Sequence, residues 1–299
     1  MSTTMDCKAA QDETRGGEFI RVGDLLIRAV HVKLLRQYGL TSLDSLFGYA
    51  DGEVLGKPGL ADWRERIRMP LNWRGRNVVF YLKRYTRPPA SEQREQRWTC
   101  AAAASTAGVE WQRMLELTDA GISCPQPVAF GEEVCGGREL RSAVLIEEVP
   151  GESLENWIKH WSPPPGDITR FLSVHLARLV GRLHSRGFVH RDLYLSHVFF
   201  DSAAPVEQSL YLIDVQRVMR PRWRHLRWII KDLAALNHST PAGIAGNGER
   251  LRWLRRYLCA ARFEVDVRWL RRRVAAKTRR MARHDRRRAA RLQPRSRTP

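Results

Sequence analysis

Two stretches of the sequence decide the fold: HRDLYLSHVF at residues 190–199 and LYLIDVQRV at residues 210–218. The first places Asp192 directly after a His-Arg pair, and the second places Asp214 at the end of an apolar run that is typical of a strand. Phosphoryl transfer from a nucleotide uses one carboxylate to orient the attacking hydroxyl and another to hold magnesium on the phosphates. The two acids therefore predict phosphoryl-transfer chemistry.

The composition indicates a folded chain with one strongly basic end. The 299 residues are 43% hydrophobic, which is enough for a core, and the net charge is +19. Residues 249–299 hold 19 Lys and Arg residues against four Asp and Glu residues, so most of the charge lies there. The cysteines form no Cys-x-x-Cys pair, which argues against a zinc site or a disulfide framework. Because no signal peptide and no run of 18 apolar residues occur, we expect a cytoplasmic protein.

The spacing of apolar residues predicts a β-rich first half and a helical second half. TSLDSLF at residues 41–47 indicates a short capped helix. The runs WRERIRM and VVFYLKRY predict a β-hairpin that carries Lys83 in its second strand. Helical spacing follows over residues 91–122 with a stop at Gly121, and PVAFGEE and SAVLIEEVPG then predict two more strands. Beyond Gly151 the pattern is mostly helical, so the predicted fold class is α+β.

Several residues occur in the order found in protein kinases. Over roughly residues 45–240 the chain resembles the protein-kinase-like superfamily. The residues that carry this resemblance are Lys83, Glu110, Glu147-Glu148 before Pro150-Gly151, His190-Arg191-Asp192 and Asp214. Within the superfamily, HRDLYLSHVFF, LIDVQRV and WIIKDLAALNHS resemble the lipopolysaccharide core (heptose/Kdo) kinases of Gram-negative bacteria.

The resemblance implies a bilobal protein-kinase-like fold with a β-rich N-lobe and a mainly helical C-lobe. The boundaries that we expect are an N-terminal extension at 1–38, the N-lobe at 39–149, the C-lobe at 150–285 and a basic, disordered tail at 286–299.

By the same resemblance, the catalytic loop begins at His190. Asp192 would orient the acceptor hydroxyl and accept its proton, while His190 and Arg191 are framework residues around it. Asp232, near the start of a later helix, would hydrogen-bond the backbone of this loop. The alternative is that HRD is a turn that ends a helix, and that Asp232 is an ordinary acid near a helix N-terminus.

The implied metal site departs from that of ordinary protein kinases. Asp214 matches their metal-binding acid, but it begins Asp-Val-Gln instead of Asp-Phe-Gly. His197 stands where an Asn usually holds the second metal, and imidazole suits softer metals better than Mg²⁺. The resemblance implies ATP and Mg²⁺ as cofactors, with Mn²⁺ as an alternative metal.

The implied nucleotide contacts lie in the N-lobe. Lys83 would bind the α- and β-phosphates and pair with Glu110, with Glu116 as the alternative partner. The backbones of Glu147 and Val149 would read the adenine edge.

The glycine loop that covers the phosphates in protein kinases has the poorest match. GEVLGKPGLADW contains three glycines without the G-x-G-x-x-G spacing. Gly56 and Gly59 are the candidate phosphate contacts, although a glycine-containing turn has many other uses.

The segment 215–231 points to the class of acceptor. It contains no Ser, Thr or Tyr, so it carries no activation-loop phosphosite, and it contains five arginines. Because arginine forks bind phosphate and carboxylate groups bidentately, an acidic sugar suits this segment better than a peptide. The candidate acceptor contacts are Arg217, Arg220 and Arg222, together with Tyr194, which stands where Ser/Thr protein kinases have a Lys.

The C-terminal helix interleaves Trp269, Leu270, Val274 and Met281 with clustered arginines. Such a helix could dock on an anionic membrane surface and hold the enzyme beside a lipid-anchored acceptor. Alternatively, its apolar stripe packs on the C-lobe and its charged face is merely solvated. Nucleic acid is the least favoured partner.

We therefore predict an ATP-dependent kinase that phosphorylates a sugar hydroxyl of lipopolysaccharide core, or of a related acidic glycolipid, at the cytoplasmic face of the inner membrane. The first alternative is a small-molecule or protein kinase of the same fold. The second is a pseudokinase scaffold that binds anionic membrane or nucleic acid, an alternative that His197 and the missing glycine after Asp214 leave open.

Overall fold

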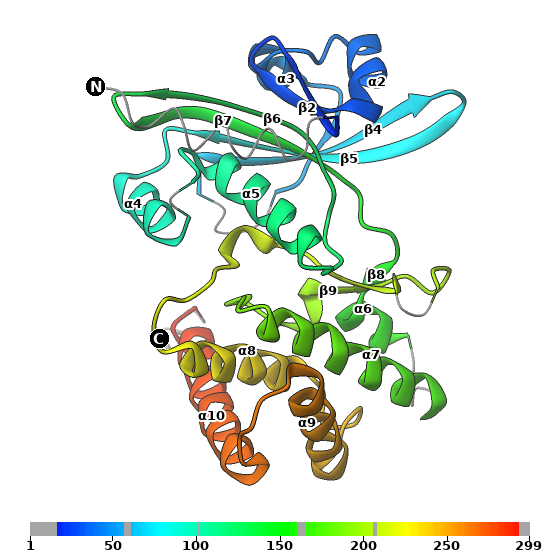
Figure 1. The fold of residues 1–299 in the computed structure, drawn as a ribbon, viewed down its shortest axis with the longest axis vertical. Coiled ribbons are helices and arrows are strands. Elements are labelled where there is room, and N and C mark those ends of the chain that lie inside the picture. Colours follow the sequence, from blue (N-terminus) through cyan, green and yellow to red (C-terminus); the bar gives the residue numbers. More distant parts are fainter. Residues whose placement is uncertain (1–16, 57–60, 101, 161–165, 206–207, 293–299) are drawn as a thin grey trace, which may run out of the picture. The chain divides into compact units, whose positions relative to one another are not determined.

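The computed structural model describes residues 17–56, 61–100, 102–160, 166–205 and 208–292, and it divides into two compact units. The first, which we call the sheet unit, runs to Asp119 and includes Cys124–Val149. The second, the helical unit, contains Ala120–Ser123 and everything from Pro150 onward. Both units are drawn in Figure 1.

The sheet unit is built on seven antiparallel strands in the order β1-β2-β6-β7-β5-β4-β3. The strands are β1 (Phe19–Val22), β2 (Leu25–Arg28), β3 (Glu53–Val54), β4 (Arg64–Trp73), β5 (Arg76–Thr86), β6 (Pro127–Cys135) and β7 (Arg138–Glu147). Its helices are α2 (Val32–Gln37), α3 (Leu43–Gly48), α4 (Ala90–Thr99) and α5 (Thr106–Asp119), and the 3₁₀ turn η2 (Ala29–His31) leads into α2.

The predicted hairpin is the long pair β4–β5, which lies between β7 and the edge strand β3. Ile67, Met69 and Leu71 alternate with more exposed residues along β4, as expected for a strand with one buried face. The turn uses Arg74 and Gly75, both at positive φ, which matches the twist of a two-residue hairpin.

Helices cover both faces of this sheet. The core under α2 and α3 contains Leu34, Leu35, Leu43 and Leu46, which pack with Ile67 and its neighbours on β4. Figure 1 shows α5 on the opposite face, where it packs on β6 and β7. The Ser42 side chain caps α3 in a capping box with Ser45, so the capped helix predicted at residues 41–47 is present.

Residues 1–38, which we expected to be an extension, differ from that expectation. From residue 19 onward they contribute β1, β2 and α2 to the sheet unit. Leu25 and Ile27 are fully buried beside β6. A strand of four residues buries only two side chains on the core face, which is too short a pattern to distinguish from a loop by periodicity.

The helical unit holds five helices in its described part, with a small sheet ordered β10-β9-β8. The helices are α6 (Leu154–Lys159), α7 (Gly166–Ser185), α8 (His225–Ser239), α9 (Asn247–Ala261) and α10 (Val267–Leu292). The strands are β8 (Glu152–Ser153), β9 (Val198–Phe200) and β10 (Leu210–Leu212), and the 3₁₀ turns are η3 (Leu195–His197) and η5 (Val215–Arg217). The predicted α+β class, with a β-rich part before a helical part, is confirmed.

Glycine permits the close packing of α7 on α9. A Cβ at Gly181 would lie 2.6 Å from the Cβ of Ala260 and 2.9 Å from its carbonyl carbon. No side chain fits there, so this glycine determines how near the two helices approach.

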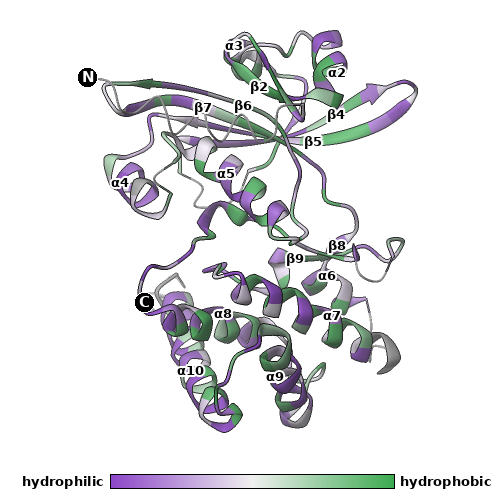
Figure 2. Cartoon of the chain, viewed as in Figure 1, coloured by the Kyte–Doolittle hydropathy of each residue, from purple (hydrophilic) through white to green (hydrophobic). Residues whose placement is uncertain are grey.

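The C-terminal helix packs on the helical unit through its apolar side. Leu270 and Val274 are buried, α10 lies against α8, and Asn237 of α8 donates to the Thr278 hydroxyl at 3.0 Å. Figure 2 shows that most residues of the α10 ribbon are coloured as hydrophilic. The helix continues to Leu292, so the residues that we expected to begin a disordered tail at 286 are helical up to that point. Among the described residues, no helix is both long and apolar enough to span a membrane.

Candidate functional site

A buried ion pair joins β5 to α5 in the sheet unit. Lys83 Nζ pairs with Glu110 Oε1, and their side chains are 11% and 2% exposed. The Tyr85 hydroxyl donates to the other carboxylate oxygen of Glu110 at 3.1 Å, so both oxygens have partners. The alternative partner Glu116 pairs with Arg113 at 2.6 Å instead. The expected contact between Lys83 and Glu110 is thus present, and their role in binding a nucleotide stays a prediction.

The position of Glu110 depends on how α5 begins. Glu139 of β7 accepts hydrogen bonds from the backbone N–H and the hydroxyl of Thr106, both at 2.8 Å. The Ser142 hydroxyl accepts from the N–H of Ala107 at 3.2 Å and donates to Glu139. These contacts satisfy N–H groups that a helix N-terminus leaves unpaired, and they tie α5 to the sheet. Burial is the main cause of a raised pKa for the Glu139 carboxyl.

The other predicted nucleotide contacts lie elsewhere in the sheet unit. The N–H of Glu147 donates to the Gln126 carbonyl at 3.0 Å, and its carboxylate lies 2.7 Å from Nε2 of His31. Val149 is buried at the end of the unit. Gly56 follows β3, and a Cβ there would meet nothing within 4 Å. Gly59 lies outside the described residues.

In the helical unit, Asp232 of α8 anchors the loop that carries HRD. Its fully buried carboxylate accepts from the backbone N–H groups of His190, at 2.6 Å, and Arg191, at 2.8 Å. This is the hydrogen bonding that the resemblance implies for that acid. It also holds Arg191 at φ 73°, a conformation that side chains other than glycine adopt at some cost.

A buried chain of hydrogen bonds supports Asp232 from two further helices. His184 of α7 has Nε2 3.4 Å from Asp232 Oδ2, and its Nδ1 lies 2.8 Å from the Tyr257 hydroxyl of α9. All three residues are fully buried or nearly so, and burial raises the pKa of Tyr257, so this phenol stays a neutral donor. The loop is thus fixed by contacts from α7, α8 and α9.

The neighbours of His190 and His197 determine which ring nitrogen of each histidine donates a hydrogen bond. His190 Nε2 lies 3.0 Å from the Ile213 carbonyl, which only accepts, so Nε2 carries a proton. Burial lowers the pKa of His190, and the imidazole is therefore neutral. His197 Nδ1 lies 2.8 Å from the Asp192 carbonyl, so Nδ1 is the ring nitrogen that donates there.

This hydrogen bond leaves Nε2 of His197 as the atom that can bind a metal. It lies 3.7 Å from Oδ2 of Asp214. In the part of the chain that the structure describes, no cluster of three or more His, Cys, Asp or Glu side chains forms a ready-made metal site. An oxygen and a nitrogen side by side nevertheless fit a divalent cation whose remaining ligands are substrate phosphates and water.

The Asp192 carboxylate lies between two cations. Arg217 Nη1 donates to Oδ2 at 2.7 Å, and Lys231 Nζ is 3.7 Å from Oδ1. Lys231 also donates to the Arg191 carbonyl. Burial is the largest influence on Lys231 and lowers its pKa, although Asp192 opposes the shift.

Lys231 contacts the Asp192 carboxylate but is not among the site residues predicted from the sequence. It lies 39 positions after Asp192 in the chain, and it precedes Asp232 in the segment WIIKDLAALNHS. That segment was one of the three that carried the resemblance, so the lysine beside the supporting acid was the signal that could have found it.

The remaining predicted acceptor contacts, Tyr194, Arg220 and Arg222, form no ion pair with the Asp192 carboxylate. The N–H of Tyr194 donates to the Asp192 carbonyl at 2.9 Å, and burial is the first cause of a raised pKa for its phenol. Arg220 places its guanidinium 4.1 Å from the centre of the Phe188 ring. Arg222 is exposed. Only Arg217 of the three arginines therefore forms an ion pair with Asp192.

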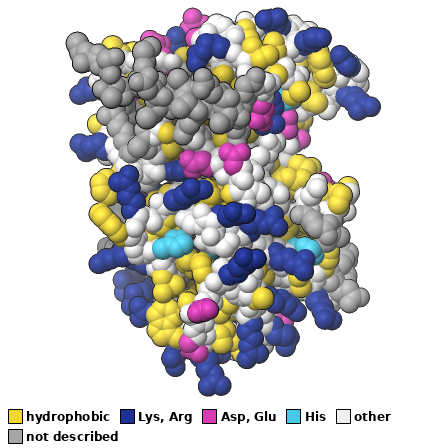
Figure 3. Space-filling model, viewed as in Figure 1, with side chains coloured by type: hydrophobic (Ala, Val, Ile, Leu, Met, Phe, Trp, Pro, Cys, Tyr) yellow, Lys and Arg dark blue, Asp and Glu magenta, His cyan; other side chains and the backbone are white. Residues whose placement is uncertain are grey.

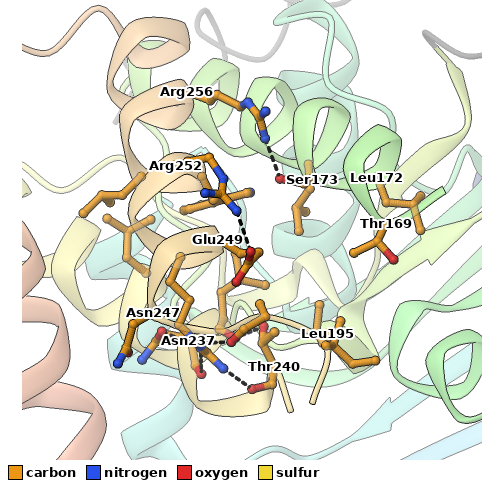
Figure 4. Close-up of a pocket in the computed structure, with 18 of the residues that line it drawn as sticks. Thr169, Leu172, Ser173, Leu195, Asn237, Thr240, Asn247, Glu249, Arg252 and Arg256 are labelled. Carbon is orange, nitrogen blue, oxygen red and sulfur yellow. Dashed lines mark hydrogen bonds and ion pairs between the residues drawn. The ribbon is translucent and has the colours of Figure 1, made fainter. Parts of the chain in front are cut away.

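The helical unit also contains a large cavity of about 1130 Å³. Figure 4 shows Leu172 and Leu195 on its apolar side and Arg256, which donates to the Ser173 hydroxyl at 3.1 Å. Arg250 crosses its wall and donates to the carbonyls of Asn237, Thr240 and Ala245 at 2.7 to 2.9 Å. None of the predicted catalytic, metal-binding, nucleotide-binding or acceptor-binding residues lines this cavity.

Comparison with known proteins decides the family. The chain matches the lipopolysaccharide kinase (Kdo/WaaP) family over residues 73–255. The chain belongs to this family. The matched range contains Lys83, Glu110, Asp192 and Asp214.

The relatives of this Kdo/WaaP-family chain are sugar kinases by name. It is 34% identical over 154 residues to the lipopolysaccharide core heptose(I) kinase WaaP of Pseudomonas aeruginosa, covering 50% of this chain and 58% of the relative. It is 29% identical over 137 residues to the protein of the same name from Escherichia coli K12, covering 44% and 52%. A 3-deoxy-D-manno-octulosonic acid kinase of Xylella fastidiosa is 26% identical over 184 residues, covering 54% and 67%. The matches to the two WaaP proteins thus span between half and two thirds of their length.

Among solved structures, this family member resembles WaaP in a complex with acyl carrier protein. The TM-score is 0.61 at 25% sequence identity, and the match covers 85% of this chain and 98% of that one. Both the predicted family and the predicted protein-kinase-like fold are confirmed.

Proposed function

We propose that this protein is an ATP-dependent kinase that phosphorylates a sugar hydroxyl of lipopolysaccharide core or of a related acidic glycolipid. The environment of Asp192 carries the proposal. Its carboxylate lies beside the cations Arg217 and Lys231, and His197 connects its backbone to Asp214. The names of the relatives support the sugar acceptor.

In this proposal, Asp192 accepts the proton of the acceptor hydroxyl. Its Oδ2 already accepts from Arg217, so Oδ1 is the oxygen that would bind the hydroxyl. The hydrogen bonds that the loop N–H groups of His190 and Arg191 donate to Asp232 keep the Asp192 carboxylate in place without a rearrangement during the reaction.

The nucleotide would be held by groups already described. Lys83, oriented by Glu110, would bind its phosphates, and the backbones of Glu147 and Val149 would contact the adenine edge. Asp214 and Nε2 of His197 would hold a divalent cation, Mg²⁺ or Mn²⁺. When bound, such a cation neutralises charge on the phosphates.

Lys231 would compensate for the residue that Tyr194 replaces. Ser/Thr protein kinases place a lysine two residues after the catalytic acid, where it steadies the transferred phosphate. Here α8 brings the ammonium group of Lys231 to the same carboxylate from a distant part of the chain. We infer that Lys231 stabilises the negative charge of the transferred phosphoryl group.

This role predicts an alkaline limit on activity. Burial lowers the pKa of Lys231 from its usual 10.5, so this side chain loses its charge at a pH below 10.5. We therefore expect kcat/KM to fall at a pH below 10.5. Lys231→Arg keeps a charge at every accessible pH, so its alkaline limb should move upward. The charged groups that act on Lys231 are Arg191, Asp192, Arg217 and Asp232. A small cavity between α8 and α10 is lined by Lys231 and by four further cationic residues, Arg227, Arg273, Lys277 and Arg280.

The pH profile of kcat/KM from pH 7 to pH 10.5, measured for the wild type and for Lys231→Arg, checks this prediction. An identical alkaline limb in the two proteins would show that another group titrates. Lys231→Met should be impaired across the whole range.

We also propose a peripheral position at an anionic membrane, where a lipid-linked acceptor would be found. Because Leu270 and Val274 pack within the helical unit, α10 would contact lipid through its basic face alone. Such binding contributes about 1 kcal/mol per basic residue near the surface and weakens with salt.

Phosphate transfer to a defined acceptor tests the proposed function. Purified protein with ATP and Mg²⁺ or Mn²⁺ should phosphorylate isolated, dephosphorylated core oligosaccharide, detected by mass spectrometry. Activity on a peptide or a small molecule, with none on any core acceptor, would make the proposed substrate class wrong. Nucleotide binding without turnover would favour the scaffold alternative.

A further inference from the structure

A second, smaller cavity lies in the helical unit between α8 and α10, and we call it the basic pocket. Its volume is about 350 Å³, within the range of pockets that hold small ligands. It is lined by Arg227, Trp228, Ile230 and Lys231 from α8 and by Arg273, Ala276, Lys277 and Arg280 from α10.

No acidic side chain in the lining neutralises the positive charge of this pocket. Five of its eight lining residues are Lys or Arg, and no Asp or Glu lines it. Within the described residues, Lys231 pairs with Asp192, whereas no carboxylate pairs with Arg227, Arg273, Lys277 or Arg280. Like charges held close together repel, and a bound anion would relieve that repulsion. Figure 3 shows the excess of Lys and Arg over acids on the visible face of this unit.

The lining also has the chemistry of a sugar site. Arg guanidinium groups bind phosphate or carboxylate oxygens through paired N–H donors. Trp228 and Ala276 add apolar surface for the carbon atoms of a sugar ring. Three cations surround the Trp228 ring, at 5.4 Å for Arg191 and 5.8 Å for both Arg227 and Lys231, so the positive charge extends across this wall.

Lys231 connects the pocket to the reacting carboxylate. It lines the pocket, and its Nζ lies 3.7 Å from Asp192 Oδ1. One acceptor molecule could therefore place a hydroxyl at Asp192 and an anionic group in the pocket. We propose that the basic pocket binds a phosphate- or carboxylate-bearing sugar of the acceptor, next to the sugar that is phosphorylated. The inference rests on the proposed function, because it assigns the pocket to the same acceptor.

Steady-state kinetics with a soluble acceptor test the pocket without any membrane. The double variant Lys277→Gln/Arg280→Gln removes two lining charges, while Arg268→Gln/Arg283→Gln removes two from α10 outside the lining. With deacylated, charged core oligosaccharide, KM for the acceptor should rise about tenfold or more in the first variant, and kcat should change less. KM in the control should stay within about twofold of wild type. Equal KM values in the two variants would overturn the proposal.

The chemistry of the anion is tested from the acceptor side. Removing the acceptor's phosphates, or reducing its carboxylates, should raise the wild-type KM towards that of the pocket variant. The modification with the larger effect identifies the group bound. If neither modification changes KM, the pocket does not bind an acceptor anion. Loss of binding to anionic vesicles in the pocket variant, with KM for the soluble acceptor unchanged, would likewise overturn the proposal in favour of a membrane contact.

Direct binding separates failure of this inference from failure of the proposed function. Arg280→Gln alone, at an exposed position, serves if the double variant does not fold. Calorimetric titration with glucose 1-phosphate and with 3-deoxy-D-manno-octulosonic acid, without nucleotide, should give weaker binding in Arg280→Gln than in Arg268→Gln. If wild type transfers no phosphate yet this difference is present, the function is wrong and the pocket stands. If the difference is absent, the pocket assignment is wrong whatever the turnover.

Discussion

Asp192→Asn should lower the rate of phosphate transfer by about 10³-fold, because an amide cannot accept the proton of the acceptor hydroxyl. Asparagine has nearly the same shape as aspartate, and the loop backbone stays bonded to Asp232. Lys231 keeps its hydrogen bond to the Arg191 carbonyl. The loss should therefore appear in kcat, while nucleotide affinity stays within a few fold of wild type. Single-turnover kinetics and a nucleotide-binding titration measure the two quantities separately.

A matched control for this substitution is Asp44→Asn on α3. It also removes a carboxylate that pairs with a neighbouring side chain, Arg141, at 2.7 Å. Because Asp44 is not one of the residues of the proposed site, this variant should keep wild-type turnover. If Asp192→Asn retains more than about a tenth of the activity, Asp192 is not the proton acceptor.

Lys83→Met should both abolish turnover and destabilise the protein. Removing one partner of a buried ion pair leaves an uncompensated charge, and the expected loss in unfolding free energy is about 3 kcal/mol. Glu110 is 2% exposed, and of the described residues only Tyr85, through its hydroxyl, would still donate a hydrogen bond to the Glu110 side chain. Loss of the phosphate contact should reduce kcat/KM by at least about 10²-fold. Urea denaturation and steady-state kinetics measure the two effects.

The double variant Lys83→Met/Glu110→Gln separates these effects. Glutamine carries no charge and still accepts from Tyr85, so most of the lost stability should return. Activity should stay low, because the cation that binds phosphate is still missing. Recovery of activity together with stability would show that the pair acts only through folding.

Arg141→Met on β7 is the comparison for a surface pair. Arg141 donates to Glu133 at 2.6 Å, but the two side chains are 32% and 48% exposed. Exposed ion pairs contribute at most about 1 kcal/mol, so this variant should lose much less stability than Lys83→Met. An equal loss in both would mean that the burial of the Lys83–Glu110 pair has no energetic consequence.

Much of the fold could be predicted because it rests on local patterns. Alternating apolar residues identify β4 and β5. Helical spacing identifies α5 and α7, and a serine cap identifies α3. The short strands β1 and β2 escaped prediction because four residues carry too little periodicity. β2 joins the sheet by pairing with β6, more than 100 residues away, and β1 joins it only through β2.

In the candidate site, too, some features could be predicted from the sequence and others could not. The sequence by itself determined the kinds of residue present and their order, so Lys83 with Glu110 and Asp192 with Asp214 followed from spacing and resemblance. Only the tertiary structure placed Arg217 and Lys231 on the Asp192 carboxylate and brought α10 against α8 to form the basic pocket. Ion pairs between distant residues depend on packing angles and on burial, which changes both the strength of a charge interaction and the pKa of the groups involved. Neither quantity is a property of a local stretch of sequence, so both became visible only in the folded chain.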